Sequence, residues 1–87
     1  MPYRLPAKVT MVEAPAVIDA GLAALRAGER EFDLGDVVEC DSSVLACVNE
    51  WRRHAALLGG GAVHVSNAPD PIRKIARLYG VESLSLG

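Results

Sequence analysis

The residues best suited to chemistry in this chain form one short segment, Asp41-Ser42-Ser43, directly before an apolar helical pattern. Ser and Asp side chains often accept backbone N–H bonds where a helix begins, which stabilises the helix by about 1 kcal/mol. A hydroxyl at that position also lies in a field that favours negative charge, so the helix would stabilise a phosphoryl group there. The acidic residues that precede the segment would repel the same group, so the segment could act as a charge switch. The residues alone leave both interpretations open.

Other catalytic or metal-binding patterns are weak. Cys40, Cys47 and His54 are spaced by seven residues, a pattern that could suggest a metal site. Along a helix, however, Cys47 and His54 would lie about 10 Å apart, too far for one zinc ion. Cys47 is expected to be a small core residue, and neither His54 nor His64 has a nucleophile nearby in the sequence. The glycines 59–61 end a helical pattern and lack the Lys and Ser or Thr of a phosphate-binding loop. We therefore predict no metal, no cofactor and no enzyme active site.

Composition restricts the class of protein further. The 87 residues are 51% hydrophobic, 5% aromatic and 23% charged, which excludes a disordered chain. A chain this short forms at most one domain, residues 1–87, with a small core, so we expect it to function by binding a partner. It has no apolar run of about 18 residues and no apolar start, so we expect no membrane insertion, no secretory signal and a cytoplasmic location.

The charge is small in total but uneven along the chain. The formal net charge of −2 argues against nucleic acid as a partner. Residues 1–50 hold four basic and nine acidic residues, whereas residues 51–87 hold five and two. These charges are either solvated faces or a surface offered to a partner, with Arg52, Arg53 and Arg73 as candidates for steering its approach.

Hydrophobic periodicity predicts three helices. Apolar residues recur with helical spacing between 17 and 25, which predicts a helix of about 12 residues that ends near Gly28. A longer pattern over 44–58 predicts a second helix directly after the Asp-Ser-Ser segment. Asp70 as N-cap and Pro71 in the first turn predict the start of a third. The apolar face of this third helix would consist of Ile72, Ile75, Ala76 and Tyr79.

Short alternating segments predict strands at Val9–Val12, Glu31–Leu34 and 62–66, with a last strand or turn over 81–86. Pro6 interrupts any strand before them, which indicates an edge strand or an extended arm. Because helices separate the strands, we expect parallel pairs joined by right-handed crossovers. The alternation also indicates a sheet that is buried mainly on one face.

At this point the sequence resembles a known family. Phe32–Val37 followed by Val38–Ala46 is similar to the signature of STAS domains, which occur in sulfate transporters and in bacterial anti-sigma-factor antagonists. Ala76–Val81, and residues 50–53 before a glycine-rich turn, resemble the small STAS subunit of the Mla phospholipid-transport ABC complex (MlaB-like). The resemblance covers residues 8–85. It implies an α/β fold of three to four helices packed on a small mixed four-stranded sheet, with no catalytic activity.

The resemblance also implies partners. In the Mla branch, the domain would bind and support the cytoplasmic ATPase of the transporter, lie at the inner membrane through that partner, and help maintain outer-membrane lipid asymmetry. In the antagonist branch, a partner kinase would phosphorylate Ser42 and so control binding. Asp41 would orient the loop and Ser42 would hydrogen-bond to the partner. The implied contact consists of Asp41, Ser42, Ser43, Val44 and Leu45.

Two departures from the family pattern bear on these expectations. Val44 stands where the family often has Gly or Ala, and a larger side chain there could alter the close approach of a partner. The family usually opens with two strands, and only one is evident before Pro15. The sheet edge would then be covered by residues 3–5, by a partner or by a second copy, which makes a homodimer possible.

Overall fold

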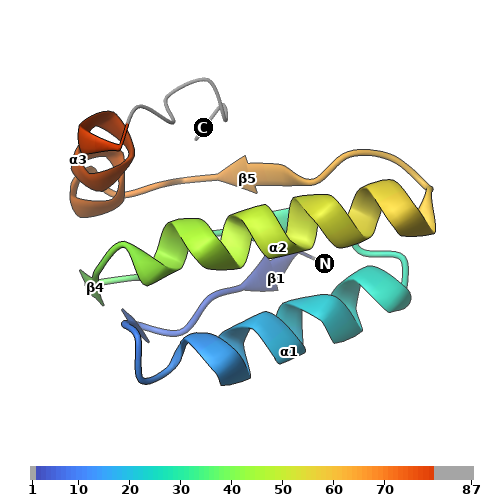
Figure 1. Ribbon diagram of the computed structural model, residues 1–87, viewed down its shortest axis with the longest axis horizontal. Helices are drawn as coiled ribbons and strands as arrows, with labels where there is room; N and C mark the ends of the chain where they lie inside the picture. The colour runs from blue at the N-terminus through green and yellow to red at the C-terminus, as the bar shows by residue number, and fades with distance from the viewer. Residues whose placement is uncertain (1, 80–87) are drawn as a thin grey trace.

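The computed structural model describes residues 2–79, which form three helices and five short strands (Figure 1). The strands are β1 Tyr3–Arg4, β2 Lys8–Val9, β3 Glu31–Asp33, β4 Glu39–Cys40 and β5 His64–Ser66. The helices are α1 Ala14–Arg26, α2 Ser43–Leu58 and α3 Asp70–Leu78. The predicted order of alternating strands and helices is confirmed, with two additional short strands, β1 before Pro6 and β4 before α2. Two strands therefore precede α1, where only one was evident from the sequence. The element predicted over 81–86 lies outside the described residues.

Every strand pair within residues 2–79 is parallel. One sheet has the order β1-β3-β5, in which Phe32 of β3 lies between Tyr3 of β1 and Val65 of β5. A second sheet pairs β2 with β4. Between the two sheets, Val38 N donates a hydrogen bond to Ala7 O. Parallel pairing is what the helical crossovers predict. The mixed sheet that the family resemblance implied is not found in this part of the chain.

Pro6 lies between β1 and β2 and explains the break in the first strand, because proline lacks the N–H that a strand ladder needs. The strand predicted over Val9–Val12 is wrong beyond its first residue. Glu13 Oε1 accepts a hydrogen bond from Thr10 N at 2.9 Å and another from Thr10 Oγ1. These bonds turn the chain into α1 directly after β2.

The core lies between the sheet and two helices. α1 and α2 run side by side across one face of the strands (Figure 1). In β3 and β5 the central residue is buried and its neighbours are exposed or half-buried, which confirms the predicted one-faced sheet. Trp51 of α2 has its ring centroid 4.6 Å from that of Phe32 and 6.0 Å from that of Tyr3. Its indole N–H donates to Ile18 O of α1 at 3.1 Å and so joins the two helices.

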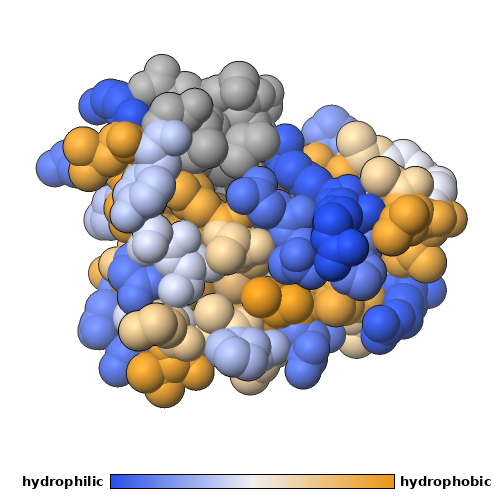
Figure 2. Space-filling view, viewed as in Figure 1, coloured by the Kyte–Doolittle hydropathy of each residue, from blue (hydrophilic) through white to orange (hydrophobic). Residues whose placement is uncertain are grey.

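Three predicted details at the helix ends are wrong. The N-cap of α3 is Pro69, and Asp70 lies in the first turn without a capping bond from its side chain. Leu58 and Tyr79 belong to the predicted apolar faces but are exposed, because each stands at the very end of its helix. Figure 2 shows the resulting hydrophobic surface over the C-terminal end of α2, at the right of the view.

Candidate functional site

Asp41 fixes the start of α2. Its Oδ1 accepts a hydrogen bond from Ser43 N at 2.8 Å, and its Oδ2 accepts one from Met11 N at 3.1 Å. The bonds from Ser43 and Met11 lower the pKa of Asp41, because they stabilise the ionised carboxylate. One carboxylate therefore ties the turn before α1 to the first turn of α2, which is the orienting role expected of Asp41.

Ser42 is exposed at the N-cap position of α2, where its side chain makes no capping hydrogen bond. Its backbone is helical, with φ −62° and ψ −13°, whereas a capping residue typically has an extended backbone. The helix N–H groups are satisfied in part by Asp41 instead. The capping interpretation thus holds for Asp41 and not for Ser42, which is exposed at the beginning of a 16-residue helix.

The remaining residues of the predicted contact lie deeper. Ser43 is half-buried, while Val44 and Leu45 are buried in the core. As they are placed here, Val44 and Leu45 offer no surface to a partner, and this part of the prediction needs correction. The side chain of Val44 points into the protein, so its size does not obstruct a partner that approaches Ser42.

The cysteines beside the site lack the character of nucleophiles. Burial raises the pKa of the Cys47 thiol to about 11, so it remains protonated at neutral pH. Cys47 is a core residue, as predicted, and Cys40 is half-buried at the end of β4. His64 lies on the exposed side of β5, as predicted. Within residues 2–79, no three His, Cys, Asp or Glu side chains are grouped so that they could hold a metal ion.

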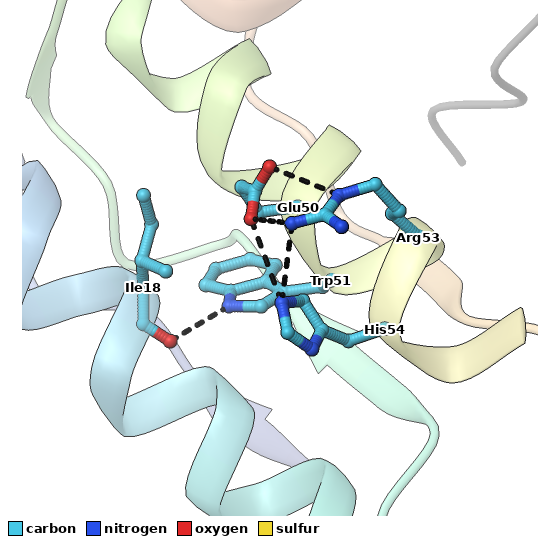
Figure 3. Close-up of polar contacts among 5 residues, drawn as sticks. All are labelled: Ile18, Glu50, Trp51, Arg53 and His54. Atoms are coloured by element: carbon cyan, nitrogen blue, oxygen red, sulfur yellow. Dashed lines mark hydrogen bonds and ion pairs between the residues drawn. The ribbon is translucent and has the colours of Figure 1, made fainter. Parts of the chain in front are cut away.

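A group of charges occupies the outer face of α2 (Figure 3). Arg53 donates to both carboxylate oxygens of Glu50, at 2.8 and 3.3 Å, and His54 Nε2 lies 3.6 Å from Glu50 Oε2. The bonds from Arg53 lower the pKa of Glu50 because they stabilise its charged form. Arg73 donates to Ala68 O at 2.9 Å. Since Glu50 partly neutralises Arg53, the steering expected of this basic surface is weakened at Arg53.

Two exposed hydrophobic residues next to the site, Met11 and Val12, escaped prediction because they were assigned to a strand. A signal for their true position is present in the sequence. Thr10 and Glu13 have the spacing of a capping box, in which a Ser or Thr is followed three residues later by Glu or Gln. That motif marks the first turn of a helix, so residues 11 and 12 belong to a turn.

Comparison with known proteins places the fold in a family. The family model described as "Mlab, STAS domain" matches residues 4–86. The searches of curated proteins and of solved structures gave no match. No helix in residues 2–79 combines the length and the apolar character needed to cross a bilayer. Because the match extends over nearly the whole chain, the chain belongs to the STAS family, as a domain of the MlaB type.

Proposed function

We propose that this domain is a non-enzymatic subunit that binds and supports the cytoplasmic ATPase of a phospholipid-transport ABC transporter of the Mla type. In that role it would contribute to outer-membrane lipid asymmetry, and it would lie in the cytoplasm, at the inner membrane through its partner. STAS domains generally act by binding. The observation that carries the proposal is the exposed Ser42 at the start of α2, in a chain that matches the MlaB type.

The local geometry suits a rigid contact. Asp41 holds the backbone of the presenting turn through two hydrogen bonds, and buried Val44 and Leu45 anchor the first turn of α2 to the core. Ser42 is therefore presented with little conformational freedom left to lose on binding, which favours affinity. Its hydroxyl can both donate and accept a hydrogen bond.

The proposal is tested by co-purification with the ATPase subunit. Ser42→Asp should weaken the complex, because it adds a second carboxylate beside Asp41 at the contact. Asn49→Asp is the matched control, since it adds the same charge at another exposed position of α2. Unchanged binding by a folded Ser42→Asp protein would count strongly against this contact.

A second candidate function is that of an anti-sigma-factor antagonist, switched by phosphorylation at Ser42. The exposed Ser42 hydroxyl without a capping bond favours it, because a kinase needs an accessible acceptor. Incubation with a cognate kinase and ATP, followed by intact mass measurement, separates the two functions. Phosphate on the wild type that is absent from Ser42→Ala supports the antagonist, whereas a stable ATPase complex without phosphate supports the transporter subunit.

A further inference from the structure

Two exposed apolar side chains, those of Met11 and Val12, belong to the turn that bonds to Asp41, and the proposed function gives them no role. Met11 is 75% exposed and Val12 is 83% exposed, in the turn between β2 and α1. Met11 N donates to Asp41 Oδ2, and Asp41 N donates to Val9 O at 3.3 Å. This turn therefore lies against the segment that presents Ser42. Figure 2 shows hydrophobic surface at the lower left of the view, where Figure 1 places the start of α1.

The turn is a fixed part of the fold. Glu13 accepts two hydrogen bonds from Thr10, and Ala14 N donates to Thr10 O at 2.9 Å. These bonds, together with the one from Met11 N to Asp41, define the backbone on both sides of Val12. Isolated exposed apolar residues are common on protein surfaces. Two adjacent ones on a turn this firmly held form a pre-organised apolar projection.

The surrounding charges select the kind of occupant. Glu13 lies in this turn, and Asp41 and Glu39 lie in the neighbouring segment 39–41. Arg4 and Lys8 line a groove together with Val12 and Glu13, and each is already paired with an acid, Arg4 with Asp36 at 3.1 Å and Lys8 with Glu39 at 3.7 Å. Among these residues the four acids outnumber the two bases, so the surface is acidic on balance. Two copies that met through this surface would bring like charges together, which opposes association. The surface fits a different protein, one with an apolar depression bordered by hydrogen-bond-donating groups.

We infer that Met11 and Val12 form the apolar part of a single partner surface whose polar part is Ser42, and that both contact the same ATPase subunit. This inference rests on the proposed function. It gives the contact the usual composition of a protein interface, with apolar anchors beside polar groups. The polar part sets specificity through Ser42, and the apolar part supplies surface that is removed from water on binding.

The test compares three substitutions of exposed apolar residues by lysine. Met11→Lys and Val12→Lys alter the turn, and Leu57→Lys is the control, because Leu57 is 76% exposed but lies near the far end of α2. The dissociation constant of the ATPase complex is measured by calorimetric titration. Each turn substitution should weaken binding about tenfold, whereas the control should bind like the wild type. Met11→Gln and Val12→Thr, which change charge and volume less, should weaken binding in the same direction.

The possible results separate the inference from the proposed function. Wild-type affinity in both turn substitutions, alongside lost binding in Ser42→Asp, overturns the inference and leaves the proposed function standing. A wild-type chain that does not bind the ATPase overturns both. A wild-type dimer that Met11→Lys dissociates in sedimentation experiments also overturns the inference, since a second copy would then occupy the surface. Thermal melts should show all variants folded, because the altered side chains are exposed.

Discussion

Asp41 connects two parts of the fold through a single side chain. Its carboxylate accepts backbone N–H bonds from Ser43 in α2 and from Met11 in the turn before α1. Its negative charge also lies at the N-terminus of α2, where the helix dipole favours an anion. The residue therefore acts on the candidate site by positioning the turn that carries Ser42.

This role predicts a pH-dependent effect of Asp41→Asn. The variant should unfold at a lower temperature near neutral pH, because an amide has one acceptor oxygen where the carboxylate uses two. The folded-state pKa of Asp41 is lowered, so its stabilising contribution is present above the unfolded value of about 3.9 and is lost as pH falls through the folded value. The difference in melting temperature between wild type and variant should therefore shrink in acid. Calorimetry over this pH range measures it.

The control for this prediction is Asp19→Asn, at an exposed position of α1. It removes the same charge without removing the two backbone contacts described for Asp41. The same loss and the same pH response in the two variants would contradict the positioning role of Asp41.

Gly21 is required by the indole ring of Trp51. A Cβ atom at position 21 would lie 2.2 Å from Trp51 Nε1, which is far inside van der Waals contact. Replacing Gly by Ala within a helix usually stabilises it by about 0.5–1 kcal/mol. Here Gly21→Ala should instead lower the free energy of unfolding by about 1–3 kcal/mol, as overpacking in a core does. Urea denaturation gives the value, and the cost should be smaller when Trp51 is replaced by Phe. Equal costs in both backgrounds would show that the indole is not responsible.

Arg30 joins the ends of two helices. Its guanidinium donates to Leu25 O at 2.9 Å and Glu29 O at 2.8 Å at the end of α1, and to Gly59 O at 2.5 Å and Gly61 O at 3.2 Å after α2. Helix C-termini leave carbonyls without intrahelical partners and carry partial negative charge, both of which a cation satisfies. All three glycines of 59–61 have positive φ, between 77° and 107°, a conformation that favours glycine. The triple glycine is thus a helix end, as predicted, shaped around Arg30.

Arg30→Lys should therefore be destabilising although it conserves the charge. A lysine ammonium cannot reproduce the planar fork that reaches carbonyls of both helix ends. We expect the free energy of unfolding to fall by about 1–3 kcal/mol, measured by urea denaturation. Arg26→Lys, an exposed position in the last turn of α1, should leave it nearly unchanged. A similar loss in both variants would argue that arginine geometry at position 30 is unimportant.

The helices were predictable because their apolar spacing is a local property of the sequence. α1 and α2 begin and end within about two residues of their predicted limits. Arg30 and Gly21 were not identified, because their roles depend on contacts with segments about 30 residues away along the chain. For the candidate site, the sequence indicated the segment Asp41-Ser42-Ser43. It could not indicate which side chain binds the backbone or which faces outward, since that depends on the turn before α1.

One sheet edge of the molecule runs along β1 and β2. Backbone groups of Leu5 and Ala7 bond inward to the neighbouring strands, so strand alternation turns those of Arg4, Pro6 and Lys8 outward. Pro6 offers no N–H, and the two other outward-facing residues of this edge, Arg4 and Lys8, are charged. Proline and charge are both features that prevent unwanted pairing of edge strands. Homodimer formation stays an untested expectation, and these features oppose it along this edge.

Pro6→Thr should make this edge competent for pairing. The substitution restores a backbone N–H at the centre of the edge and introduces a β-branched residue that favours strands. It should cause concentration-dependent self-association under conditions in which the wild-type chain sediments as a monomer. Pro15→Thr is the control, because Pro15 is an exposed residue in the first turn of α1, away from the strand ladder. If Pro6→Thr sediments as the control does, or if the wild type already pairs through this edge, Pro6 is not what prevents the chain from self-associating there. If association appears only in Pro6→Thr, the missing N–H of Pro6 is what prevents this edge from pairing with a second copy.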